Sequence, residues 1–156
     1  MSKRIAILHG ALIDGNGAEP IRDSVLLLCD DKIEAVGAVG EILIPEDAEQ
    51  IDAQGKFIIP GLIEGHGNVG GYDGIYVLQE SVKWGITTVV SVSGGEDGIR
   101  LREAIRKNRI RSCAKLIVGG VICSTGGHLK GNPVDGPWEI RRAVRHYAEI
   151  EVDFIK

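Results

Sequence analysis

The sequence lacks the long apolar segments that membrane proteins and secreted precursors carry. No apolar run reaches the roughly 20 residues that a bilayer-spanning helix needs, and no signal-type apolar core follows residues 1–4. A clustered positive charge of the kind that binds nucleic acid is also missing. The formal net charge is -4, and the lysines and arginines are dispersed along the chain. These absences predict a cytoplasmic protein with neither a membrane nor a nucleic acid among its partners.

Cysteine is scarce, and motifs for binding phosphate are absent. Cys29, Cys113 and Cys123 are odd in number and show no CxxC spacing, so reduced thiols are expected. No Gly-Lys-Ser/Thr follows Gly126-Gly127 as a P-loop requires, and Gly94-Gly95 falls short of a dinucleotide fingerprint.

Hydrophobic residues make up 44% and charged residues 26% of the 156 positions, which is typical of one soluble globular domain.

Residues 1–56 carry strand patterns and turn signals but no helix of useful length. Residues 5–8 and 11–14 are expected to form one strand or a bent pair of strands, and further strands are expected at 24–29 and 33–37. The Asp-Gly-Asn-Gly run at 14–17 is a strong turn signal. Apolar and polar residues alternate in 33–37, which favours a β-hairpin with one solvated face. This part of the chain therefore predicts a small antiparallel sheet.

From residue 57 the pattern changes to alternating strands and helices. Strands are expected at 58–63, 86–90, 115–120 and 152–156, and helices at 75–84, at 98–108 and from Pro137 onward. Strand starts recur roughly every 28 to 37 residues, which fits βα units in a parallel sheet. The spacing alone leaves a barrel and an open, doubly wound sheet nearly tied. Because a barrel needs eight strands and typically about 250 residues, this would be the front part of a longer protein, or a piece that needs a partner.

Polar residues follow the predicted strands at the end where α/β folds place their chemistry. They are His66 and Asn68, the segments 91–97 and 123–128, and Lys156. His66 is a candidate metal ligand through a neutral ring nitrogen, although a lone histidine among glycines is equally well explained as a strand cap. Asn68 would point the same way, and its carbonyl oxygen suits a harder cation better than zinc.

Two further candidates carry less weight on the residues alone. Lys156 would have to be neutral or modified to face a metal, since an ammonium cannot coordinate a cation, and a solvated lysine is the simpler interpretation. His128 is a candidate substrate contact, but an ordinary turn histidine explains it as well. The basic segments at 100–111 and 141–145 are interpreted as solvated helix faces.

Several separated motifs resemble the amidohydrolase superfamily. Residues 59–66, Ile-Pro-Gly-Leu-Ile-Glu-Gly-His, are similar to its PGLID-x-H-x-H signature. Segments 85–89, 124–128 and 152–156 resemble its imidazolonepropionase-like and metal-dependent dipeptidase branch. The resemblance implies an α/β fold class. Residues 1–56 would be the N-terminal part of a composite β-sandwich, and residues 57–156 the first half of a (β/α)8 TIM-type barrel, truncated at the fourth strand.

The resemblance also implies a chemistry. It predicts a metal-dependent amidohydrolase in which one or two divalent ions, most often zinc, activate water to hydrolyse a C–N bond of a small-molecule amide or dipeptide. His66 would be a metal ligand, and Lys156 a possible carboxylated lysine that bridges two metals. Asn68 departs from the signature, because a second histidine is expected there. The family's later ligands, two histidines and an aspartate, have no counterpart in this chain.

Two other hypotheses stay open at this point. A relative that has lost its metal would serve as a binding or scaffold protein, inactive on its own, and Asn68 favours that hypothesis. A gene fragment that never acts alone is the third. An exposed half-barrel also predicts association, including a possible homo-oligomer, or poor solubility.

Overall fold

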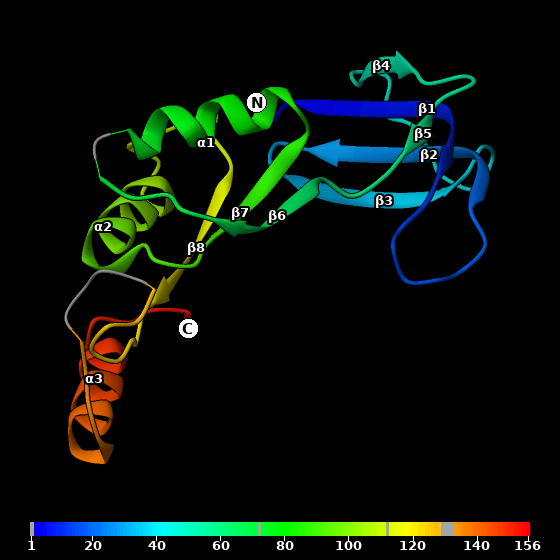
Figure 1. Ribbon diagram of the computed structural model, residues 1–156. Coiled ribbons are helices and arrows are strands. Elements are labelled where there is room, and N and C mark those ends of the chain that lie inside the picture. Colours follow the sequence, from blue (N-terminus) through cyan, green and yellow to red (C-terminus); the bar gives the residue numbers. More distant parts are fainter. Residues whose placement is uncertain (1, 72, 112, 129–132) are drawn as a thin grey trace. The chain divides into compact units, whose positions relative to one another are not determined.

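The computed structural model describes residues 2–71, 73–111, 113–128 and 133–156. The chain forms two compact units, Met1–Pro60 and Gly61–Lys156 (Figure 1). Each unit has a hydrophobic core of its own. The division falls after residue 60, whereas the sequence pattern placed it after residue 56.

The first unit is a five-stranded sheet. Its strands are β1 (Arg4–Leu12), β2 (Ile21–Cys29), β3 (Lys32–Ala38), β4 (Glu49–Asp52) and β5 (Phe57–Ile58). The sheet order is β3-β2-β1-β4, and β5 also pairs with β1. The apolar residues Ala6, Leu8, Val25 and Leu27 form its buried core. The β2–β3 hairpin is antiparallel, as the alternation in 33–37 predicted.

β1 is one continuous strand, which is the first of the two predicted alternatives, and a bulge at His9 (φ 65°) takes up the irregularity between its two segments. The parallel pairing in the first unit differs from the predicted antiparallel sheet. β4 and β5 pair with β1 in parallel. Parallel pairing follows a crossover rather than a tight hairpin, so it has no short-range signature in the sequence.

The second unit alternates strands and helices, as predicted. Its elements are β6 (Leu62–Gly67), α1 (Gly74–Lys83), β7 (Ile86–Ser91), α2 (Gly95–Arg106), β8 (Lys115–Gly120), α3 (Pro137–Glu149) and β9 (Phe154–Ile155). The strands form a parallel sheet in the order β6-β7-β8-β9. Leu78 of α1 and Leu101 of α2 pack with Val89, Leu116 and Val118 of the sheet. The predicted fold class is therefore correct: a β-sheet unit precedes the first four strands of a curled, barrel-type parallel sheet.

The predicted strand 58–63 is divided between the two units. Its first residue ends β5, and its last two begin β6. Pro60 lies between them and has no N–H to donate to a sheet. At Gly61 an added Cβ would overlap the Thr87 side chain, so this position admits only glycine. β6 continues to Gly67, and His66 lies inside the strand rather than after it.

Two expectations about the whole chain can be compared with the structure. Cys29, Cys113 and Cys123, which all lie among the described residues, are free thiols, as predicted. Within the described ranges, no helix has the length and apolar character needed to cross a bilayer.

Candidate functional site

The structure brings together His66 and Lys156, two residues that the sequence separates by 90 positions. The Lys156 Nζ atom lies 3.3 Å from the His66 Nε2 atom. His66 belongs to β6 and Lys156 directly follows β9, so the two side chains come from opposite edges of the four-stranded sheet. They can meet only because the sheet is curled.

The chemistry of the two groups limits how protons can be arranged at this contact. When Lys156 is an ammonium it has three donors and no acceptor, so it donates and the His66 Nε2 atom accepts. An accepting Nε2 atom belongs to the imidazole tautomer that carries its proton on Nδ1. Both side chains are exposed. A neutral imidazole with its lone pair on Nε2 is the form of histidine that binds metals.

Asn68 has a different partner on the same unit. The Ser93 hydroxyl, from the segment after β7, donates to the Asn68 Oδ1 atom at 2.8 Å. Next to this pair, the buried Ser91 hydroxyl donates to the Val69 carbonyl at 2.7 Å and accepts from the Val69 N–H at 2.9 Å. These bonds tie the segment after β6 to β7. The amide oxygen proposed as a cation ligand therefore already accepts a hydrogen bond.

His128 lies in the loop between β8 and α3, on an exposed bend. Asp135 holds the described parts of this loop together. Its carboxylate accepts from the Thr125 N–H at 3.0 Å and from the Thr125 hydroxyl, and these bonds hold the pKa of Asp135 below its ordinary value. The Asp135 N–H in turn donates to the Glu139 Oε2 atom at 2.6 Å. Residues 129–132 lie outside the described ranges.

The side chains typical of metal sites do not gather into a set of three. Among the described residues, no group of three or more His, Cys, Asp and Glu side chains is placed to hold a metal ion.

One prediction about charge is wrong. Arg102 belongs to the basic segment interpreted as a solvated helix face, yet it is only 7% exposed. Its guanidinium bonds to Asp153 and to the Glu151 carbonyl. The helical periodicity of α2 could have predicted this burial. Arg102 follows Gly98 by four residues and Leu101 by one, and all three residues are buried. Asp153 was likewise not singled out from the sequence.

Comparisons with known proteins point to enzymes that act on C–N bonds. The chain is 34% identical over 125 residues to "Deacetylase Atu3266" of Agrobacterium fabrum, which covers 74% of this chain and 30% of that protein. It is 37% identical over 59 residues to an imidazolonepropionase of Stenotrophomonas maltophilia, covering 38% of this chain and 14% of that protein. The chain thus spans less than a third of the length of these curated relatives. No protein-family model matches the sequence.

A solved structure shows the same fold. A Xaa-Pro dipeptidase with methionine bound in its active site superposes with a TM-score of 0.81 over 98% of this chain and 46% of its own, at 23% sequence identity. Taken together, the motif at residues 59–66 and the two curated relatives indicate the amidohydrolase superfamily, and the solved structure agrees with them in fold.

Proposed function

We propose that this chain contributes the first residues of a metal site in an amidohydrolase that cleaves a C–N bond of a small-molecule amide or dipeptide. The observation that carries the proposal is the 3.3 Å contact between His66 Nε2 and Lys156 Nζ. It joins two strand ends of a barrel-type sheet, on the side where such folds place their chemistry. Similarity to a deacetylase and an imidazolonepropionase supports the reaction class, and the dipeptidase fold suits a dipeptide substrate.

The residues present fit a divalent metal when Lys156 is carboxylated. As an ammonium, Lys156 directs positive charge at the His66 lone pair and excludes a cation. Carboxylation of Lys156 removes the positive charge of its Nζ atom and places carbamate oxygens near the His66 Nε2 atom. His66 would then hold the metal through Nε2 and Lys156 through its carbamate oxygens. A bound divalent ion would lower the pKa of water and polarise the substrate carbonyl.

The other polar residues of the rim would orient the substrate. Because the Ser93 hydroxyl donates to the Asn68 Oδ1 atom, the NH2 group of Asn68 would donate to the substrate. That group suits a carbonyl or carboxylate oxygen of an amide or dipeptide. The buried Ser91 holds the backbone at Val69 and so keeps the Asn68 side chain in place. His128, on the exposed loop after β8, is proposed as a further substrate contact.

Metal content and lysine carboxylation test the proposal directly. The chain is loaded with zinc in the presence of ¹³C-bicarbonate, and bound zinc and the carbamate ¹³C signal are measured. The same measurements on His66→Ala and Lys156→Met are expected to lose both. His146→Ala removes a histidine of α3 that is not among the proposed ligands, and is the matched control that keeps both. Zinc binding that survives both site substitutions would falsify the site. If the parent chain itself binds no zinc, these residues alone do not build a metal site.

One observation favours a second function, that of a metal-free binding protein. Asn68 stands where the superfamily signature has its second histidine, and its oxygen is occupied by the Ser93 hydroxyl. A site of this kind would bind an amide-bearing small molecule through hydrogen bonds without cleaving it. Calorimetry with a dipeptide, in the presence of a metal chelator, separates the two functions. Binding that is unchanged by the chelator supports the binding protein, and binding that requires metal supports the hydrolase.

A further inference from the structure

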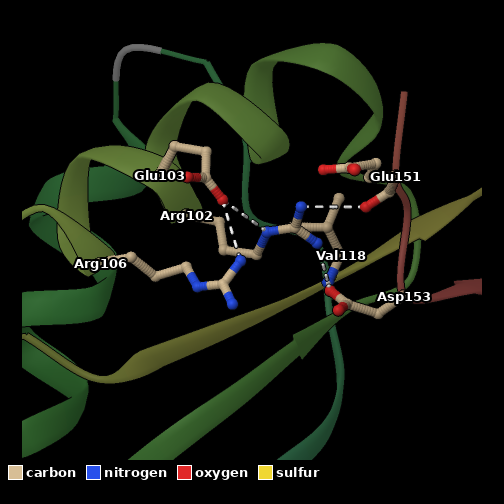
Figure 2. A network of polar contacts seen from close by, with 6 residues as sticks. All are labelled: Arg102, Glu103, Arg106, Val118, Glu151 and Asp153. Atoms are coloured by element: carbon tan, nitrogen blue, oxygen red, sulfur yellow. Dashed lines mark hydrogen bonds and ion pairs between the residues drawn. The ribbon is translucent and has the colours of Figure 1, made fainter. Parts of the chain in front are cut away.

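Arg102 of α2 is a buried cation that donates hydrogen bonds to the turn directly before β9. Its Nη1 atom donates to the Asp153 Oδ2 atom at 2.8 Å, and its Nη2 atom donates to the Glu151 carbonyl at 2.9 Å (Figure 2). Within the described residues its Nε atom has no hydrogen-bond partner and lies 3.6 Å from the Glu103 Oε1 atom. A buried charge is costly unless it is paired, so this guanidinium depends on the turn before β9.

Asp153 connects the same turn to β8. Its Oδ2 atom accepts the Val118 N–H at 2.7 Å, and its own N–H donates to the Val118 carbonyl at 2.8 Å. The carboxylate thus takes the place of a strand carbonyl just before β9 begins. One oxygen of Asp153 receives both the strand N–H and the Arg102 guanidinium, as Figure 2 shows.

The turn before β9 has an uncommon backbone conformation. It directly precedes Phe154–Ile155, the residues of β9 that pair with β8. Glu151 has a φ of 60°, a conformation that residues other than glycine, asparagine and aspartate rarely adopt. Arg102 bonds the carbonyl of that residue. These contacts hold the residues directly before β9 against α2 and β8, and they therefore set the register in which β9 pairs with β8.

We propose that Arg102 and Asp153 are a positioning pair that fixes the register of β9 against β8 and thereby holds Lys156 against His66. A slip of one residue in β9 would turn Lys156 to the opposite face of the sheet. In the fixed register the Lys156 N–H donates to the Gly120 carbonyl, and the Lys156 carbonyl accepts from the Ile122 N–H, each at 2.8 Å. The value of this positioning for hydrolysis rests on the proposed function, but the positioning itself does not.

Amide hydrogen exchange and histidine ¹⁵N NMR test the proposal on the whole chain, without metal or substrate. In Arg102→Leu, the amides of Lys156 and Ile122 are expected to exchange about tenfold faster, relative to amides of the β6–β7 pair such as that of Val92. The His66 Nε2 signal, which responds to a donor at that atom, is expected to shift as it does in Lys156→Met. Both changes are local to β9 and to its contact with His66.

Two controls separate positioning from a general loss of stability. Arg106→Leu removes an arginine of the same helix that pairs with Glu103 at 3.1 Å and is 67% exposed. It is expected to change neither readout. Leu101→Ala weakens the core beside Arg102 and is expected to speed exchange in β6–β7 and at Lys156 alike. If Arg102→Leu behaves like Leu101→Ala, the pair stabilises the unit but does not position Lys156, and the proposal is overturned.

A conservative substitution at the other partner guards against misfolding. In Asp153→Asn the amide oxygen can occupy the place of Oδ2 and accept both hydrogen bonds, so the His66 signal should stay near its parent position. Asp153→Ala offers no acceptor and should shift that signal as Lys156→Met does. If the His66 Nε2 signal has the same position in Asp153→Asn and in Asp153→Ala, Asp153 does not position Lys156. A chain that binds no zinc would refute the proposed function and leave these results unaffected.

Discussion

Asn68 decides which ligands the rim of the parallel sheet can accept. Its Oδ1 atom is engaged by Ser93, and an amide oxygen is in any case a weaker zinc ligand than imidazole. Asn68→His is expected to raise zinc affinity by at least about tenfold, the scale on which single groups at metal sites act. Zinc titration by calorimetry measures the change.

Two further variants show whether that gain comes from the site proposed here. Asn68→Ala serves as the matched control, because it removes the Ser93 bond without adding a ligand, and should leave affinity near the parent value. Combining Asn68→His with His66→Ala should abolish the gain, since the new imidazole would then lack its partner. A gain that persists without His66 would place the zinc elsewhere.

At the scale of elements, Asp153 links the stability of the β8–β9 pair to pH. Burial raises the pKa of Asp153, but the hydrogen bonds from the Val118 N–H and from Arg102, with the charges of Arg102 and Arg106, outweigh it and hold the pKa below its ordinary value. Ionised Asp153 therefore stabilises the folded chain above about pH 3.9, its unfolded pKa. This stabilisation is lost as the pH falls from there through the lower folded-state pKa.

We therefore expect the free energies of unfolding of the parent and Asp153→Asn to differ most at neutral pH and to converge in acid. Urea unfolding at a series of pH values from about 7 to about 2 measures the difference. Asp97→Asn removes an exposed carboxylate of α2 and is expected to change the free energy of unfolding little at any pH. A difference that is constant down to the lowest pH would mean that Asp153 acts through shape alone.

Local signals predicted most of the elements of the second unit. Helices α1, α2 and α3 follow their apolar spacing, and β7 and β8 follow their β-branched runs. The parallel pairing of β4 and β5 with β1 was not predictable, because it depends on contacts between distant segments. The same holds for the contact between His66 and Lys156, which requires the curl of a whole sheet. The identity of the superfamily came from its motifs rather than from periodicity.

At the scale of the whole chain, the two units have separate cores. Leu27, 4% exposed, belongs to the core of the first unit, and Leu78, 0% exposed, to that of the second. Replacing either by alanine leaves a cavity, which typically costs about 2–5 kcal/mol. We expect Leu27→Ala to speed amide exchange in β1, β2 and β3, and Leu78→Ala to do so in α1, β7 and β8.

Exchange measured residue by residue on both variants tests whether each core supports only its own unit. Leu43→Ala, at a side chain that is 90% exposed, is the control and should change stability by no more than about 0.5 kcal/mol. If either core variant loosens both units equally, the chain unfolds as one cooperative body. If the effects stay separate, damage to the first unit leaves the His66–Lys156 contact intact, because both residues belong to the second.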